Sequence, residues 1–326
     1  MQTSNKCTTW TCALKLLGKL ALVFLLGVLV VGIITLSTLG GKSGFEDTYQ
    51  SAIQRKYEKL KSIEGPKIVI LGGSNAGFGF DSVLLEEETG YPVANMGLHA
   101  GFGTLFNTEI AKRYIGQGDI VILAYEYRVG SKEFENLGDV NLIMTGIDNK
   151  LEMYRELPLK SLPVILGNLL PYLQEKVHRP HTDTGAYSSA SFDEFGHMIL
   201  KRERFVIDYD NNVEKYGTVR GKNLSKPNDQ LVYLKEYKKY VEGKGASVYF
   251  TAPVLLDKAY KGTAQDLLNY AHEIETITGI PFISDPNDYL FSSDDMFDTV
   301  YHCNEKGAKR RTELFLNDLR EYGIVD

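Results

Sequence analysis

The chain has 326 residues, of which 43% are hydrophobic, enough for one large domain or two small ones with a packed core. A net charge of -6 argues against nucleic-acid binding, which requires a clustered basic face. The 20 tyrosines fit either the amphipathic edges of a core or a cleft that faces carbohydrate.

An apolar run near the N-terminus predicts a single transmembrane anchor at residues 20–40. The run carries no charged residue and is long enough to cross a bilayer. Lys15 and Lys19 precede it and Glu46 follows it, an asymmetry that predicts a cytoplasmic segment 1–19 and an extracytoplasmic remainder. The predicted location is therefore the cell membrane, with one pass.

The alternative to an anchor is a cleaved signal peptide. Residues 35–41 offer no cleavage site of small residues, which disfavours that alternative. No cysteine stands directly after the apolar run, so a lipoprotein anchor is excluded. Of the three cysteines only Cys303 lies beyond the anchor, so no intramolecular disulfide is expected in the outer part.

After the anchor, residues 41–65 are polar and helix-prone and are predicted to form a stalk, followed by one α/β domain over 66–326. The expected strands are 67–71, 93–96, 120–125, 247–252 and 281–284. The expected helices between them are 81–89, 104–115, 228–242, 264–278 and 305–322. This alternation predicts a flavodoxin-like three-layer fold with a mainly parallel five-stranded sheet.

The alternation stops between residues 128 and 224, which we expect to be a helical and irregular insertion. Segments 141–157 and 162–177 are predicted helices. Residues 179–223 are polar with little periodicity, which is typical of a lid or a substrate platform.

Ser74 is the candidate nucleophile. It follows the first strand, which ends at two glycines, so its hydroxyl is expected at the carboxyl edge of the sheet, where ligands bind in this fold class. The local pattern matches neither a nucleophile elbow, since Ala76 replaces the last glycine, nor a phosphate loop, since no Lys-Ser/Thr follows Gly77. The alternative role is a small turn residue that precedes a helix.

His302 is the candidate general base, with Asp298 four residues before it. An aspartate can hold the imidazole through Nδ1 and leave Nε2 free for the hydroxyl of Ser74. Asp294 and Asp295 are competing carboxylates. The alternative is a surface histidine preceded by an aspartate that only caps the last helix.

Three blocks of the chain resemble the SGNH (GDSL-like) hydrolase superfamily of serine esterases and acyltransferases. The matching blocks are Gly73-Ser74-Asn75, Asn95–Gly101 and Asp298–Gly307. The resemblance implies that Ser74 is the nucleophile, His302 the base and Asp298 its orienting partner. It also implies that the N–H groups of Ser74 and Gly97 form the oxyanion hole. The alternative is that Gly97 is only a turn glycine.

The resemblance covers residues 67–127 and 247–322 and departs from the family at the third block. That block ends in Gly-x-Asn-Asp in the family, whereas this strand is followed by Glu126 and has no asparagine. A carboxylate donates no hydrogen bond unless it is protonated, so Asn75 or Arg128 is the expected substitute donor. Glu126 and Arg128 are also candidate substrate contacts, and the Asp-to-His spacing is one residue longer than in the family.

The family resemblance implies an extracytoplasmic serine esterase or O-acyltransferase that acts on ester-modified envelope polysaccharide or a teichoic-acid-like polymer. It implies no cofactor and a possible multi-spanning membrane acyltransferase as partner. The alternatives are a non-catalytic accessory or glycan-binding subunit and a promiscuous esterase of small esters. His178 and His181 have poor spacing for metal ligands, and no metal site is expected.

Overall fold

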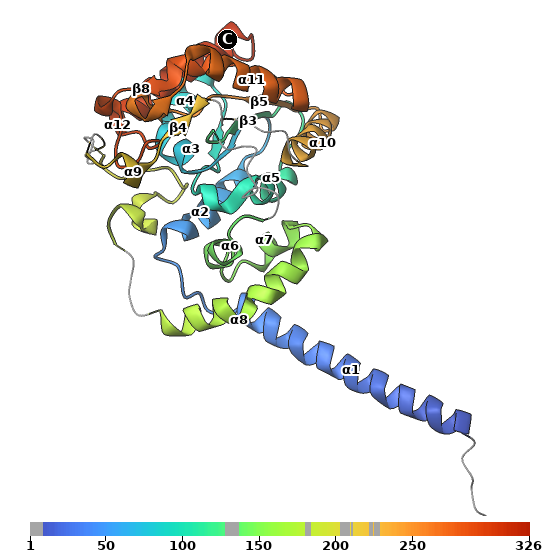
Figure 1. Ribbon diagram of the computed structural model, residues 1–326. Helices are drawn as coiled ribbons and strands as arrows, with labels where there is room; N and C mark the ends of the chain where they lie inside the picture. The colour runs from blue at the N-terminus through green and yellow to red at the C-terminus, as the bar shows by residue number, and fades with distance from the viewer. Residues whose placement is uncertain are drawn as a thin grey trace, which may run out of the picture.

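In the computed structural model, a long apolar helix projects from an α/β domain (Figure 1). The structure describes residues 9–127, 137–179, 184–202, 209, 211–221, 224 and 229–326. The projecting helix, α1, spans Thr9–Leu39, and its 30 residues from Trp10 to Leu39 are long and apolar enough to cross a membrane. The predicted membrane-spanning segment is thus a helix, and it begins earlier than the expected residue 20.

The central sheet has four parallel strands in the order β2-β1-β3-β5. The strands are β1 (Ile68–Gly72), β2 (Val93–Asn95), β3 (Ile120–Ala124) and β5 (Ser247–Phe250). The expected fifth strand at 281–284 is reduced to one bridge between Phe250 and Phe282. Pro281 has no N–H to donate to a ladder, which is consistent with this short pairing.

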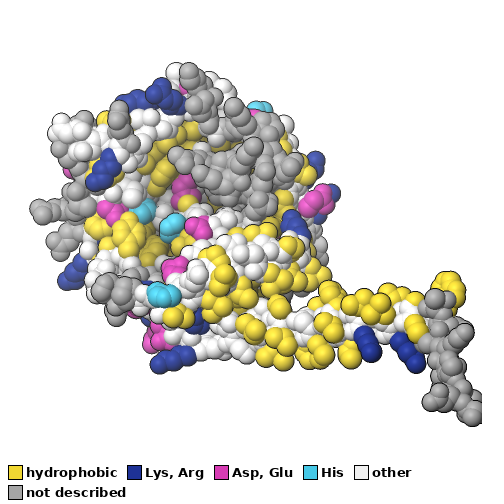
Figure 2. All heavy atoms as spheres, turned by 60° about the horizontal axis from the view of Figure 1, so that its bottom comes forward, with side chains coloured by type: hydrophobic (Ala, Val, Ile, Leu, Met, Phe, Trp, Pro, Cys, Tyr) yellow, Lys and Arg dark blue, Asp and Glu magenta, His cyan; other side chains and the backbone are white. Residues whose placement is uncertain are grey.

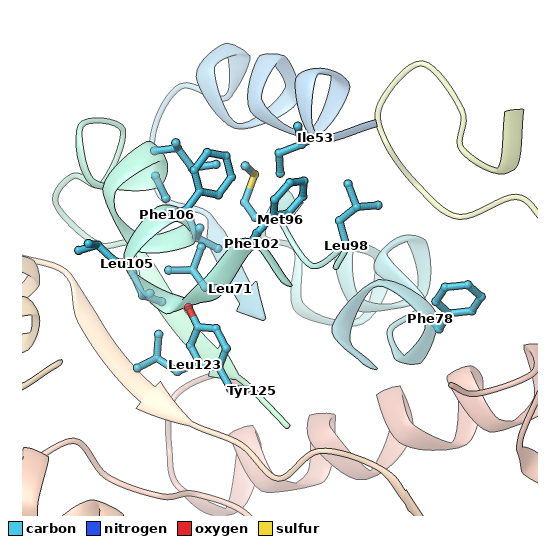
Figure 3. Packing of buried hydrophobic residues seen from close by; sticks show 14 of the residues in the cluster. Ile53, Leu71, Phe78, Met96, Leu98, Phe102, Leu105, Phe106, Leu123 and Tyr125 are labelled. Carbon is cyan, nitrogen blue, oxygen red and sulfur yellow. The ribbon is translucent and has the colours of Figure 1, made fainter. Parts of the chain in front are cut away.

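Helices cover both faces of the sheet because side chains alternate along buried strands. Leu71 and Leu123 point to one face, where they pack with aromatic residues such as Phe102 and Phe106 (Figure 3). The helices on this face are α2 (Ala52–Ser62), α5 (Gly103–Lys112), α10 (Asp229–Gly243) and α11 (Ala264–Thr278). Ile70 and Ile122 point to the other face. The helices there are α3 (Ser74–Gly79), α4 (Ser82–Thr89) and α12 (Glu305–Glu321).

Residues 41–65 are not a stalk, contrary to the sequence-based expectation. Ile53, Tyr57 and Leu60 of α2 are fully buried in the domain core. Their spacing places them on one helical face, and the charged residues that suggested a stalk lie largely on the other. Leu39, the last residue of α1, is also buried, so the long helix ends against the domain.

In its described residues, the insertion contains the helices α6 to α8, followed by a run of short elements. The helices are α6 (Val140–Gly146), α7 (Leu151–Glu156) and α8 (Leu162–His178). They are followed by the 3-10 helices η5 (Gly185–Tyr187) and η6 (Ser189–Ser191) and by the short helix α9 (Val213–Tyr216). Two small parallel pairs complete the domain: β4 (Val219–Arg220) with β7 (Tyr260–Lys261), and β6 (Leu255–Leu256) with β8 (Leu290–Phe291).

Candidate active site

Ser74 is the first residue of α3, directly after the tight turn that ends β1. The turn requires glycine because there is no space for a side chain. A Cβ on Gly72 would lie 2.3 Å from the carbonyl oxygen of Ala124, and one on Gly73 would lie 2.4 Å from Oε1 of Glu126. The sequence therefore places Ser74 at the carboxyl edge of the sheet, as expected.

His302 and Asp298 form a hydrogen-bonded pair in the loop that leads into α12. Nδ1 of the imidazole lies 2.8 Å from Oδ1 of Asp298, and both side chains are largely buried. Burial alone would raise the pKa of Asp298, but the hydrogen bond and charge of His302 and the hydroxyl of Tyr187 hold that pKa below its ordinary value. An ionised Asp298 fixes the proton on Nδ1 and leaves Nε2 as the acceptor.

Ser74 and His302 line the same cavity, whose volume is about 380 Å³. The imidazole stacks on Phe78 with a centroid separation of 4.1 Å and an angle of 2°, and Phe78 lies one turn after Ser74 in α3. No hydrogen bond joins Ser74 to His302 among the contacts of the described residues. The remaining lining residues are Tyr49, His99, Ala100, Glu126, Tyr187, Tyr216, Thr299, Val300 and Tyr301.

Tyr187 adds a group from the insertion that the sequence did not reveal. Its hydroxyl donates to Oδ2 of Asp298 at 2.6 Å and lies 3.4 Å from Nδ1 of His302. Its ring packs against Tyr49 and Phe78. The polar segment that contains Tyr187 has no periodicity that would single this residue out, so only its partner in space shows its place.

The expected oxyanion donors Gly97 and Asn75 are both engaged elsewhere. The N–H of Gly97 donates to Oδ1 of Asn95 at 2.9 Å, and a Cβ on Gly97 would lie 2.5 Å from that of Ala76. Gly97 therefore allows a close approach of the chain to α3. Asn75 is fully buried, and its Nδ2 donates to the carbonyl oxygen of Ala124 at 3.0 Å.

Glu126 lies beside the start of α3, where its carboxylate accepts the N–H of Asn75 at 3.2 Å through Oε1. Oε2 has no hydrogen-bond partner among the described residues, and the residue is 6% exposed. A carboxyl group is thus held at a backbone N–H next to Ser74. Arg128, the other candidate contact, lies outside the described residues.

Arg311 of α12 positions the start of α3 from behind. Its fully buried guanidinium donates from Nη1 to the carbonyl oxygen of Asn75 at 2.6 Å and from Nη2 to that of Ala252 at 3.3 Å. It also stacks over Phe80 at 4.1 Å. A basic residue on the expected last helix gave no sequence signal for this role.

Comparison with known proteins does not assign a family. No family model matches the chain, and a search of curated proteins finds no significant match. Among the described residues, no three His, Cys, Asp or Glu side chains are grouped so that they could hold a metal ion. Function is therefore inferred from the geometry of the cavity.

Proposed function

We propose that this protein is an SGNH-type serine esterase or O-acyltransferase that works outside the cytoplasm. The observation that carries the proposal is that Ser74 and His302 line the same cavity. Ser74 follows the end of β1, and His302 lies in the loop before α12, where it is hydrogen-bonded to Asp298. We also propose that the sheet has a flavodoxin-like layout, in which residues 281–284 occupy the position of a fifth strand.

In the proposed reaction, Nε2 of His302 takes the proton of Ser74 while Oγ attacks the ester carbonyl carbon. The tetrahedral intermediate collapses, the alkoxide leaves with the proton from His302, and the acyl group remains on Ser74. A water or a sugar hydroxyl then gives its proton to His302 and attacks the acyl carbon, and the bond from that carbon to Oγ breaks as Ser74 takes the proton back from His302. Asp298 stabilises the imidazolium in both halves, and Tyr187 holds Asp298 in place.

The oxyanion is proposed to be held at the start of α3, by the N–H groups of Ser74 and Asn75. The Asn75 N–H already supports the negative charge of Glu126, which shows that its direction suits an anion. Glu126 and an oxyanion compete for this donor, so the carboxylate must move during turnover. One such donor contributes about a hundredfold or more to the rate.

The proposed substrate is an acylated envelope polysaccharide or a teichoic-acid-like polymer. Four tyrosines line the cavity and offer aromatic faces, which suit sugar rings: Tyr49, Tyr187, Tyr216 and Tyr301. The apolar helix α1 would keep the site near the membrane, with its N-terminus in the cytoplasm. A multi-spanning membrane acyltransferase is the proposed donor of acyl groups if the reaction runs as transfer.

A second candidate is a non-catalytic subunit that binds glycan in the same cavity. The observations that favour it are the missing Ser74–His302 hydrogen bond and the presence of Glu126 at the Asn75 N–H. A fluorophosphonate probe with intact-mass detection separates the two. An adduct on the full-length protein that is absent from Ser74→Ala and retained in Ser82→Ala supports the enzyme, whereas a folded protein that stays unlabelled supports the accessory role.

A further inference from the structure

The outer face of α8 carries a stripe of apolar side chains that nothing in the described part of the chain covers. Leu162, Leu166 and Leu170 follow at helical spacing and are 50%, 41% and 64% exposed, and Val177 continues the stripe. Leu159, just before the helix, is 89% exposed. Five large apolar side chains on one line are more than scattered surface residues and mark an interaction surface.

The opposite face of α8 already packs on the domain. Ile165 and Tyr172 are buried, and the ring of Tyr172 packs at a tilt against that of Phe45. The segment from Leu162 to Leu173 contains no charged residue. The helix is thus apolar on both sides, so core packing explains only its inner face.

A buried ion network fixes α8 to the end of α1. Asp148 is fully buried and accepts hydrogen bonds from the N–H of Gly44 at 2.7 Å and from Nζ of Lys176 at 2.7 Å. It also accepts from the hydroxyl of Tyr172. Lys176 lies 3.3 Å from the carbonyl oxygen of Thr38 in α1. Since Lys176 contacts both Asp148 and Thr38, α8 has a defined position beside the point where α1 meets the domain.

The exposed face of α8 is continuous with the apolar surface of α1. Figure 1 shows α8 lying across the base of the domain, directly at the end of α1. Figure 2, in which this base is turned forward, shows hydrophobic side chains that continue from α1 over the adjoining surface of the domain. The bilayer that α1 is suited to cross would therefore meet this surface.

We propose that α8 lies in the membrane interface, with Leu159, Leu162, Leu166, Leu170 and Val177 inserted among lipid chains. An apolar helix face of this kind binds at the boundary of headgroups and acyl chains. Lys160 lies next to Leu159 and reaches the level of the lipid phosphates, as long basic side chains do at such boundaries. The occupant is lipid, because the stripe continues the surface of the membrane helix.

The test places single tryptophans on the full-length protein in vesicles of phosphatidylcholine and phosphatidylglycerol. In a Trp10→Phe background, Leu170→Trp reports on the stripe and Val232→Trp, on the exposed side of α10, is the matched control. Brominated lipids are expected to quench Leu170→Trp several-fold more than Val232→Trp. Aqueous iodide is expected to quench Leu170→Trp several-fold less.

Equal quenching at both positions would overturn the proposal. So would shielding of Leu170→Trp from iodide without quenching by brominated lipid, in a sample whose mass is that of a dimer, because a second copy would then cover the stripe. Leu166→Trp repeats the measurement if Leu170→Trp lowers the melting temperature.

Discussion

Replacing Glu126 by glutamine tests whether the carboxylate next to Ser74 restrains the proposed reaction. Glutamine has nearly the same shape, so it keeps an acceptor for the N–H of Asn75 and removes the negative charge. It also brings a donor to the side of Oε2, which has no partner among the described residues. The change therefore supplies a side-chain amide at the place where the third block of the SGNH superfamily has an asparagine.

The size of the effect follows from the competition for one N–H. An oxyanion at that donor displaces the carboxylate by a few ångströms, and two unit charges about 4 Å apart repel by about 4 kcal/mol at an effective dielectric constant of about 20. Each 1.4 kcal/mol corresponds to about tenfold in rate. We expect Glu126→Gln to raise kcat/KM on nitrophenyl esters by at least about tenfold, with about a thousandfold as the upper bound.

The controls are Glu126→Asp, which retains the charge and is expected to gain nothing, and the double variant with Ser74→Ala, which is expected to be inactive. A folded Glu126→Gln protein whose kcat/KM is unchanged or lower would refute the reasoning, because the carboxylate would then not oppose the reaction.

Two further predictions concern groups beside His302, and a third concerns a buried lysine of α2. Asp298→Asn is expected to lower kcat/KM by about a thousandfold or more, because the imidazole loses its orientation and its countercharge. Tyr187→Phe keeps the ring but removes a hydrogen bond to a charged group, and an approximately tenfold lower kcat/KM is expected. Burial lowers the pKa of Lys56 from 10.5 to about 7. Between these values only the unfolded chain binds the proton, so the free energy of unfolding falls by about 1.4 kcal/mol per pH unit as the pH falls, and Lys56→Met removes this slope.

Each of these predictions has its own check. Asp294→Asn is the matched control for Asp298→Asn, and equal losses in both would remove Asp298 from the mechanism. For Tyr187→Phe the melting temperature is measured alongside, since a loss that tracks instability would indicate packing only. For Lys56→Met, denaturant unfolding in detergent at about pH 7.5 and about pH 9.5 measures the slope, and an unchanged slope would contradict a neutral buried amine.

Much of the sheet could be predicted from the sequence because its strands are short runs of buried apolar residues. The expected strand at 120–125 is β3 (Ile120–Ala124), and that at 67–71 is β1, shifted by one residue. The prediction of a stalk at residues 41–65 was wrong because α2 has one charged and one apolar face, and composition alone does not show that the apolar face is covered. The expected fifth strand at 281–284 forms only a single bridge, because Pro281 has no N–H to extend a ladder.

Two parts of the site could be predicted: Ser74, because it follows a buried strand, and the Asp298–His302 pair, because its members are near neighbours in sequence. Asp298 and His302 lie four residues apart, and the structure brings them into contact. Tyr187 reaches Asp298 from a segment without a pattern, so spacing carries no information about it. For Gly97 the sequence pattern predicted an oxyanion donor, but in the structure its N–H donates to the side chain of Asn95, two residues away.

The way Leu39 and Asp148 fasten the long helix to the domain has a mechanical consequence. A protein on a flexible tether sweeps a volume and can meet its substrate at many heights. Here Leu39 is buried against the domain and Lys176 lies 3.3 Å from the carbonyl oxygen of Thr38, so in a bilayer the height of the cavity mouth above the membrane would be restricted. The proposed polymer substrate would have to reach that level, and residues inserted between Leu39 and Phe45 would change which part of the polymer the site reaches.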